Sequence, residues 1–291
     1  MVHIEGLSKV FDGYTALADV HMHITKGSIY GLVGVNGAGK TTIIKHLAGV
    51  YRADSGTVTI GGQPVFDNEA VKAQVRYIPD ELYFFKYANM KALRKFFRNI
   101  YPQWDDARYE TMTAKLGLDE SRRLTKFSKG MQKQAAFVFA MASRPEVLLL
   151  DEPIDGLDPV VRKHVLETLI NDVAEREMTV LVSSHNLKEL DGLCDTVGML
   201  QGGRMSIQRD LDELKSDVHK IQVAFAPDRD VTDIPGLEIL HRENRGSINL
   251  WVIRGPEDEV AAKVKALQPL VYDRLPLTLE EIFIYEVTRH E

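Results

Sequence analysis

The chain has 291 residues, of which 44% are hydrophobic and 27% are charged, and its formal net charge is −6. This apolar content excludes a mainly disordered chain. The single Cys194 excludes a disulfide scaffold, and the mild acidity argues against general nucleic-acid binding. The longest apolar runs, at 135–142 and 147–150, are far shorter than the ~20 residues that a membrane span needs. The N-terminus does not resemble a signal peptide, so a cytoplasmic protein is expected.

Strand-like and helix-like segments alternate over the first 216 residues. An apolar run at 28–33 ends in a glycine-rich turn, and a helix is predicted directly after it at 40–47. Apolar stretches at 147–150 and 179–183 are short enough to be buried strands, with a helix predicted between them at 160–176. Buried strands that alternate with helices predict an α/β fold with a mostly parallel sheet.

The segment from about 81 to 143 has helical periodicity and no convincing strand. It predicts a helical subdomain inserted into the α/β domain. Its aromatic residues fall at helical spacing, so we expect them to form the small core of this subdomain rather than a stacking platform. These residues are Tyr83, Phe84, Phe85, Tyr87, Phe96, Phe97, Tyr101 and Trp104.

The pattern changes again after residue 216. Several short strands and two helices predict a small α+β domain at 217–291, following a first domain at 1–216. The strands are predicted at 221–225, 237–240, 248–253 and 270–274, and the helices at 256–267 and 278–287.

Residues 34–41, with the sequence GVNGAGKT, fit the phosphate-loop pattern G-x-x-x-x-G-K-[ST] between a predicted strand and a predicted helix. Glycines let backbone N–H groups approach phosphate oxygens closely, and the helix N-terminus adds partial positive charge. We expect Lys40 to act catalytically on the β- and γ-phosphates and the Thr41 hydroxyl to ligate Mg²⁺. The predicted ATP-binding residues of this loop are Gly34, Asn36, Gly37, Ala38, Gly39, Lys40, Thr41 and Thr42.

Two carboxylates, Asp151 and Glu152, follow the buried strand at 147–150. The carboxyl ends of strands form the edge of an α/β sheet where ligands bind. Asp151 suits Mg²⁺, usually through water, and Glu152 suits polarisation of the attacking water as a general base. Two solvated acids are the simpler interpretation of this pair alone. In a chain with a phosphate loop, the pair predicts a P-loop NTPase.

Four further motifs follow one another in a fixed order. Together with the phosphate loop and the carboxylate pair, they resemble the ATP-binding subunits of ABC transporters over about residues 2–216. The motifs are Phe11 at the end of Leu7-Ser-Lys-Val-Phe11, the segment Ser128-Lys-Gly130-Met-Gln132, the segment Asp155-Gly-Leu157-Asp158, and His185 after a predicted strand.

The resemblance implies a P-loop core with an antiparallel β subdomain. It also implies a head-to-tail dimer with two ATP sites, each built from both chains. In such a dimer, Phe11 stacks on adenine, while Ser128 and Gly130 face the γ-phosphate held by the other chain. The resemblance makes Asp158 a nucleotide-site residue and His185 a catalytic contact to the γ-phosphate. Independently of the family, Ser128 precedes a helical pattern and is a good N-cap.

The sequence departs from the family pattern at two positions. Asp80 stands where the family usually has Gln, and its carboxylate can ligate Mg²⁺ or hold water but cannot donate amide hydrogen bonds. We therefore expect Asp80 to be a metal ligand beside Thr41 and Asp151, although Glu81 could take this place. Lys129 replaces the second glycine of the Ser-Gly-Gly-Gln signature.

Cationic side chains gather between residues 122 and 133, interleaved with apolar positions and preceded by two acids. We expect them to form a solvated face near a partner or a lipid surface rather than a nucleic-acid patch. They are Arg122, Arg123, Lys126, Lys129 and Lys133.

The Ser-Lys-Gly-Met signature and the segment PLTLEEIF at 276–283 are similar to ABC-2-type bacterial exporters, and YPQWD at 101–105 is similar to the YtrB-like branch. The resemblance implies an ATPase subunit that powers a transporter from the inner face of the membrane. Its partners would be a second ATPase subunit, the same or different, and separate permease subunits. A non-transport ABC ATPase acting on ribosomes or DNA is the alternative. A small-molecule kinase would have no use for the signature or for His185.

Overall fold

The computed structural model describes residues 1–154, 156–226 and 234–287. The chain divides into two compact units, Met1–Gln208 and Arg209–Glu291. The sequence places this boundary at 216. The structure places it earlier because helix α7 (Leu211–Asp217) packs against strand β11 (Val218–Ala224) and helix α9 (Leu279–Val287) of the second unit.

The central sheet of the first unit has six strands in the described residues, and its inner strands are mostly apolar, with polar side chains at the ends of β7 and β8. Every residue of β3, β7 and β8 is buried. The strand order is β10-β9-β3-β8-β7-β6, and the pairs from β9 to β6 are parallel, which confirms the predicted α/β sheet. The strands are β3 (Ile29–Val33), β6 (Val75–Ile78), β7 (Val147–Asp151), β8 (Thr179–Ser184), β9 (Thr196–Gln201) and β10 (Arg204–Asp210).

A second, antiparallel sheet of the first unit has the order β2-β1-β4-β5, as the resemblance implies. Helix α1 (Lys40–Leu47) contacts strands of both sheets, and its buried Ile43 and Ile44 join their common core. The phosphate loop is therefore anchored between two sheets. The strands are β1 (Val2–Phe11), β2 (Tyr14–Ile24), β4 (Ser55–Ile60) and β5 (Gln63–Pro64).

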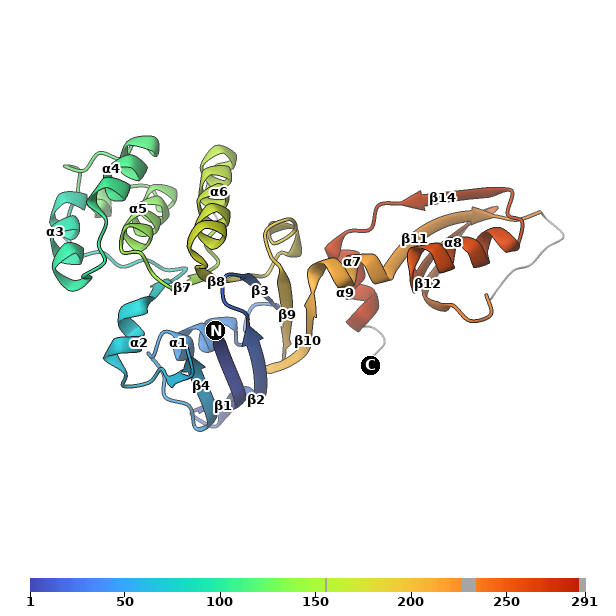
Figure 1. The fold of residues 1–291 in the computed structure, drawn as a ribbon, viewed down its shortest axis with the longest axis horizontal. Helices are drawn as coiled ribbons and strands as arrows, with labels where there is room; N and C mark the ends of the chain where they lie inside the picture. The colour runs from blue at the N-terminus through green and yellow to red at the C-terminus, as the bar shows by residue number, and fades with distance from the viewer. Residues whose placement is uncertain (155, 227–233, 288–291) are drawn as a thin grey trace. The chain divides into compact units, whose positions relative to one another are not determined.

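The remaining helices of the first unit include the predicted helical subdomain. Figure 1 shows α3, α4, α5 and α6 on one side of this unit and β1, β2 and β4 on the other. The helices are α2 (Glu69–Gln74), α3 (Met90–Ile100), α4 (Asp106–Lys115), α5 (Lys129–Ala142) and α6 (Pro159–Arg176), with short 3-10 turns at Leu124–Lys126 and Leu187–Glu189.

The aromatic residues of the helical subdomain divide into two sets, so the prediction that they form its core is only half right. Phe97 and Trp104 pack against the buried Phe139 and Tyr109 of that core. The other set is exposed because it lies on the connection before α3 and on the outer face of α3. Its members are Tyr83, Phe85, Tyr87 and Phe96.

In the described residues of the second unit, three helices accompany an antiparallel sheet of order β12-β13-β11-β14. Its core surrounds the buried Trp251 and includes Val260 and Val264 of α8 (Glu257–Ala266). The other strands are β12 (Glu238–Arg245), β13 (Ile248–Arg254) and β14 (Val271–Leu275). Within 1–154, 156–226 and 234–287, no helix is long and apolar enough to span a membrane.

Candidate nucleotide-binding and hydrolysis site

A cleft of about 470 Å³ opens over the phosphate loop. All of the predicted loop residues from Asn36 to Thr42 line it, and Phe11, Asp80 and Glu152 line it as well. Segments far apart in the sequence thus meet at one cleft. Gly34 lies beneath the loop, where its backbone oxygen accepts a hydrogen bond from Lys40.

The glycines of the phosphate loop are required by space and by backbone conformation. A Cβ on Gly34 would lie 2.5 Å from the backbone oxygen of Leu200. Gly39 caps helix α1 at a φ of 111°, a left-handed conformation that a side chain disfavours. A Cβ on Gly39 would also lie 2.9 Å from the oxygen of Ala16. The loop therefore follows one path, which ends at the N-terminus of α1.

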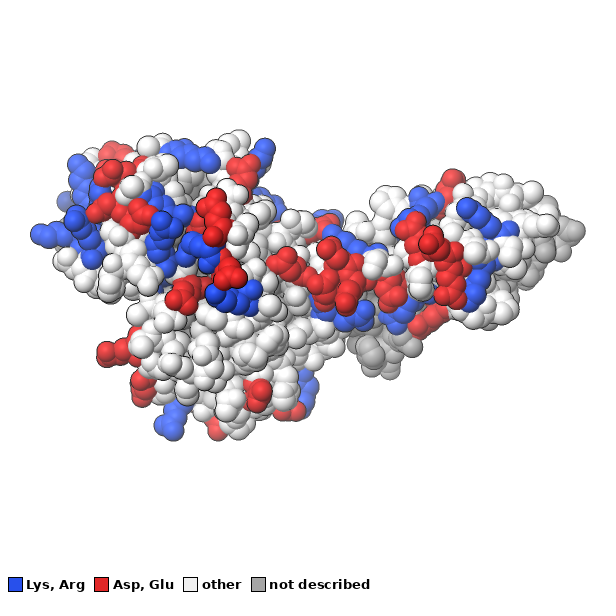
Figure 2. Space-filling model, in the orientation of Figure 1, with Lys and Arg blue, Asp and Glu red and all other residues white. Residues whose placement is uncertain are grey.

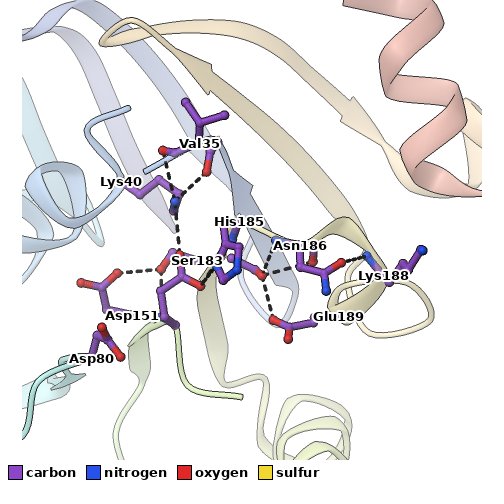
Figure 3. Close-up of polar contacts among 12 residues, drawn as sticks. Val35, Lys40, Asp80, Asp151, Ser183, His185, Asn186, Lys188 and Glu189 are labelled. Carbon is purple, nitrogen blue, oxygen red and sulfur yellow. Dashed lines mark hydrogen bonds and ion pairs between the residues drawn. The ribbon is translucent and has the colours of Figure 1, made fainter. Parts of the chain in front are cut away.

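The carboxylate of Glu152 lies between two cationic or protonatable side chains. The buried Lys40 Nζ lies 3.2 Å from Glu152 Oε1 and donates a hydrogen bond to the Gly34 oxygen over 2.6 Å. His185 Nδ1 lies 2.9 Å from Glu152 Oε2. Because a carboxylate only accepts, the Nδ1–H group donates this hydrogen bond. Figure 3 shows Lys40 and His185 approaching the end of β7 from different segments. The three predicted catalytic residues thus form one contiguous cluster.

Asp151 is held at the end of β7 by two hydroxyl groups. The Ser183 hydroxyl donates to Asp151 Oδ1 over 2.7 Å, and the Tyr77 hydroxyl donates to Oδ2 over 3.4 Å (Figure 3 shows the first). Burial and the nearby Asp151 charge raise the pKa of Tyr77, which keeps this phenol protonated. Asp151 is 2% exposed, so these two donors replace the hydrogen bonds that water would otherwise give its carboxylate.

Ser183 also connects the Asp151 carboxylate to the backbone of Glu152, and the sequence pattern did not single it out. The Glu152 backbone N–H donates to the Ser183 hydroxyl over 3.1 Å. Ser183 is fully buried in β8, whose other buried residues are mostly apolar. The sequence feature that could have identified Ser183 is its place as a polar residue at the carboxyl end of the apolar run 179–183.

Asp80 lines the cleft and forms an ion pair. Its Oδ1 lies 3.1 Å from Lys133 Nζ, and the same Nζ donates to the Glu152 backbone oxygen over 2.8 Å. The prediction that Lys133 belongs to a solvated face is therefore wrong, because its side chain is 13% exposed and faces Asp80 and Glu152. Arg122 and Arg123 of the same cationic group lie over the rings of Phe127 and Tyr87.

The signature motif and Asp158 lie outside the cleft. Ser128 caps α5 as predicted, since its hydroxyl accepts the Met131 N–H over 3.2 Å. A Cβ on Gly130 would lie 2.9 Å from the Gly156 oxygen, so these two motifs are packed together. Asp158 caps α6 by accepting two backbone N–H groups. Asp155 of the same motif lies outside the described residues.

Phe11 lies at the rim of the cleft, half-buried, beside the phosphate loop. Its ring contacts the Tyr51 ring at 5.2 Å between centroids, and Lys9 Nζ lies 5.4 Å from its centroid. This position leaves part of the ring available to a planar base.

The oxygens around the cleft fit a magnesium ion bound with a nucleotide. Mg²⁺ prefers hydroxyl, carboxylate and water oxygens. Thr41 lines the cleft, and Asp151 is buried at the end of β7, where its carboxylate accepts from the hydroxyl groups of Ser183 and Tyr77. Asp80 adds a second carboxylate at the cleft wall.

A phosphate loop after β3 of a parallel sheet, with a carboxylate pair at the end of β7 in the same sheet, defines the protein as a P-loop NTPase built for hydrolysis. A family model described as ABC transporter matches residues 17–155. The ABC transporter ATP-binding protein YtrB of Bacillus subtilis (strain 168) is 35% identical, and the alignment covers 98% of this chain and 97% of that protein. The chain belongs to the family of ABC transporter ATP-binding proteins. It is an ATP-binding and ATP-hydrolysing subunit of a transporter.

Two further similarities agree with this assignment. The linearmycin resistance ATP-binding protein LnrL of Bacillus subtilis (strain 168) is 32% identical over 70% of this chain and 68% of its own length. A solved ATP-binding subunit of an ABC transporter is 28% identical, with a TM-score of 0.68 over 74% of this chain and 92% of that one. These relatives give no support to an action on ribosomes or DNA.

Proposed function

We propose that Glu152 is the general base of ATP hydrolysis in this chain. The observation that carries this proposal is the position of its carboxylate between Lys40 and His185, at the wall of the cleft that the phosphate loop lines. The Glu152 side chain is only 13% exposed, so bulk water has little access to its carboxylate. Lys40 and His185 are the other proposed catalytic residues.

The proposed reaction is in-line attack of water on the γ-phosphorus of ATP. Glu152 takes the proton of the attacking water, and the bond between the γ-phosphorus and the β-phosphate oxygen breaks. Lys40 holds the phosphate oxygens, so phosphate binding draws its Nζ from Glu152 and frees that carboxylate to meet water. His185 holds Glu152 Oε2 and can contact the γ-phosphate. Thr41 and Asp151 would hold Mg²⁺, which supplies charge neutralisation at the phosphates, and Asp80 at the cleft wall is the third candidate ligand.

We infer that the active form is a head-to-tail dimer, homo- or heteromeric, in which Ser128 and Gly130 of one chain meet the γ-phosphate at the other. The Ser128 hydroxyl and the first N–H groups of α5 lie outside their own chain's cleft and are exposed or half-exposed. A helix N-terminus of this kind binds anions. Asp158 contributes from the N-terminus of α6, and Phe11 stacks on adenine.

The mass of the Glu152→Gln chain in solution tests this proposal. With Mg-ATP, the variant should have twice the monomer mass of 32.8 kDa, and with Mg-ADP it should be monomeric. Adding Ser128→Arg should abolish the dimer but leave ATP binding. A Glu152→Gln chain that binds ATP and stays monomeric contradicts a homodimer. The same experiment in the presence of a second ATPase subunit, encoded beside this one, then tests a heterodimer.

We propose that the permease docks on the aromatic groove, a groove of about 560 Å³ lined by residues that include Tyr83, Phe85, Phe96, Tyr101 and Arg76. Tyr83 is 87% exposed and Phe85 is 62% exposed, which is unusual for large apolar side chains. Arg76 stacks on Tyr101, and the hydrogen bonds recorded for its guanidinium go to neutral oxygens. An apolar cytoplasmic helix with one carboxylate complements this groove.

The direction of transport is proposed from a relative, and the location is proposed from the permease contact. The name of LnrL refers to resistance, and resistance to a compound is a common result of export. We therefore propose an exporter whose ATPase sits at the cytoplasmic face of the membrane through its permease. Figure 2 shows basic and acidic side chains interspersed over the helical part of the first unit, which does not favour nucleic acid on this face. Residues 209–291 are proposed to be a separate small domain.

A further inference from the structure

Lys133 connects three parts of the first unit that are distant in sequence. It lies on α5, beyond the Ser128 cap, and its side chain is 13% exposed. Its Nζ donates to the Glu152 backbone oxygen over 2.8 Å and to Asp80 Oδ1 over 3.1 Å. A charged donor with two oxygen partners at these distances is a strong contact.

Glu152 has a backbone conformation that needs such support. Its φ is 48°, in the left-handed region that a residue with a side chain rarely adopts. Its N–H is held by the Ser183 hydroxyl, and its carbonyl is held by Lys133. Because both backbone polar groups are fixed, the direction of the side chain toward Lys40 and His185 is fixed too.

We propose that Lys133 is a positioning residue for Glu152, and that Asp80 acts on hydrolysis mainly by holding Lys133. The inference rests on the proposed role of Glu152 as general base. It gives the acidic residue at position 80 a function that glutamine would not perform, because a carboxylate pairs with a lysine. The loop after β6 and helix α5 thereby both act on the base through a single ammonium group.

The competing account is that Asp80 acts directly, as a ligand of Mg²⁺. The two accounts differ in how substitutions combine. Substitutions at two residues that act through one contact are not additive, whereas independent effects multiply. If Asp80 works through Lys133, removing Asp80 matters only while Lys133 is present.

The experiment measures ATP turnover and the KM for Mg-ATP for Lys133→Met, Asp80→Ala and the double variant. Lys133→Met should lower kcat about 10- to 100-fold, the usual effect of misplacing a catalytic group. The KM should stay within about 2-fold, because Lys133 does not touch the nucleotide-binding loop. Asp80→Ala should lower kcat less, and the double variant should match Lys133→Met. Lys133→Arg, which keeps a cation, should recover part of the loss.

The control is Lys115→Met, which removes an exposed lysine at the end of α4. This variant should have wild-type turnover. Urea unfolding of each variant separates a loss of kcat from a loss of fold. If Lys133→Met does not fold, the coupling between Lys133 and Asp80 is tested with Lys133→Arg, Asp80→Ala and the double variant that carries both substitutions.

Two results would overturn the inference. One is a Lys133→Met chain with wild-type kcat, and the other is a double variant whose loss is the product of the single losses. Glu152→Gln in the same assay distinguishes this failure from a failure of the proposed function. If Glu152→Gln has normal turnover, the proposal that Glu152 is the general base fails. If Glu152→Gln is inactive while Lys133→Met has normal turnover, only the proposed role of Lys133 fails.

Discussion

Replacing Ser183 with alanine should damage both stability and catalysis, because its hydroxyl contacts the Asp151 carboxylate and the backbone N–H of Glu152. The hydroxyl donates to Asp151 Oδ1 over 2.7 Å and accepts the Glu152 N–H over 3.1 Å. A hydrogen bond to an ionised group contributes about 1.5–3 kcal/mol and a neutral one about 0.5–1.5 kcal/mol. Ser183→Ala should therefore lower the free energy of unfolding by about 2–4 kcal/mol. The substitution also leaves the buried Asp151 short of a donor.

The catalytic effect of Ser183→Ala follows from the backbone of Glu152. Without the serine, the N–H of a residue at a φ of 48° loses its partner, and the general base is less well placed. We expect kcat to fall by about 10-fold or more. Urea unfolding gives the first quantity, and steady-state phosphate release in the folded range gives the second.

Ser143→Ala is the matched control for this prediction. Ser143 is also buried, accepts from the charged Arg76 Nε over 2.6 Å and donates to the Ala140 oxygen over 2.7 Å. Its loss should cost a similar free energy of unfolding and leave kcat unchanged. The reasoning is refuted if both variants lose the same stability and Ser183→Ala keeps wild-type kcat, or if Ser183→Ala loses no stability.

Three more outcomes are expected from other parts of the chain. Burial lowers the pKa of His46, so below about pH 6.5 the unfolded chain takes up a proton that the folded chain does not. The free energy of unfolding should fall between pH 7.5 and pH 5 more steeply in wild type than in His46→Asn, as urea titrations at each pH will show; parallel curves contradict this. Replacing Tyr83 and Phe85 together with serine should abolish co-purification of the permease while the isolated chain keeps its ATP turnover; retained co-purification excludes the aromatic groove. Trp251→Ala should destabilise the second unit by about 3–5 kcal/mol. Proteolysis should then remove only residues after 208, whereas degradation of the whole chain at one rate contradicts a separate domain.

The sequence predicts the strands and helices that carry the site because their patterns are local. A short apolar run such as 147–150 has few structures open to it except a buried strand, and the phosphate loop needs its glycines at fixed positions. The order of the motifs then places Lys40 and Glu152 at one sheet edge, and the structure puts them 3.2 Å apart. These features follow from chain chemistry and from the geometry of parallel sheets.

The contacts of Ser183 and Lys133 could not be predicted, because they depend on how segments far apart in the chain come together. Lys133 follows Ser128 on a helix whose polar face looks solvated in the sequence, and only the fold brings that face to Glu152. The exposed Tyr83 and Phe85 belong to a run of aromatic residues from which the sequence predicts a helical core, but they lie on the connection before α3. Periodicity shows that a face is apolar but does not show whether this chain or another one covers it.

The most direct test of the account is the single-turnover rate of ATP hydrolysis by Glu152→Gln beside wild type. Both chains are saturated with Mg-ATP, and nucleotide binding is confirmed in the same samples. Lys40→Ala serves as the variant that loses phosphate binding. The account predicts that Glu152→Gln binds ATP normally and hydrolyses it about 10²–10⁴-fold more slowly, the usual contribution of a general base. A Glu152→Gln chain that hydrolyses bound ATP at the wild-type rate contradicts the account.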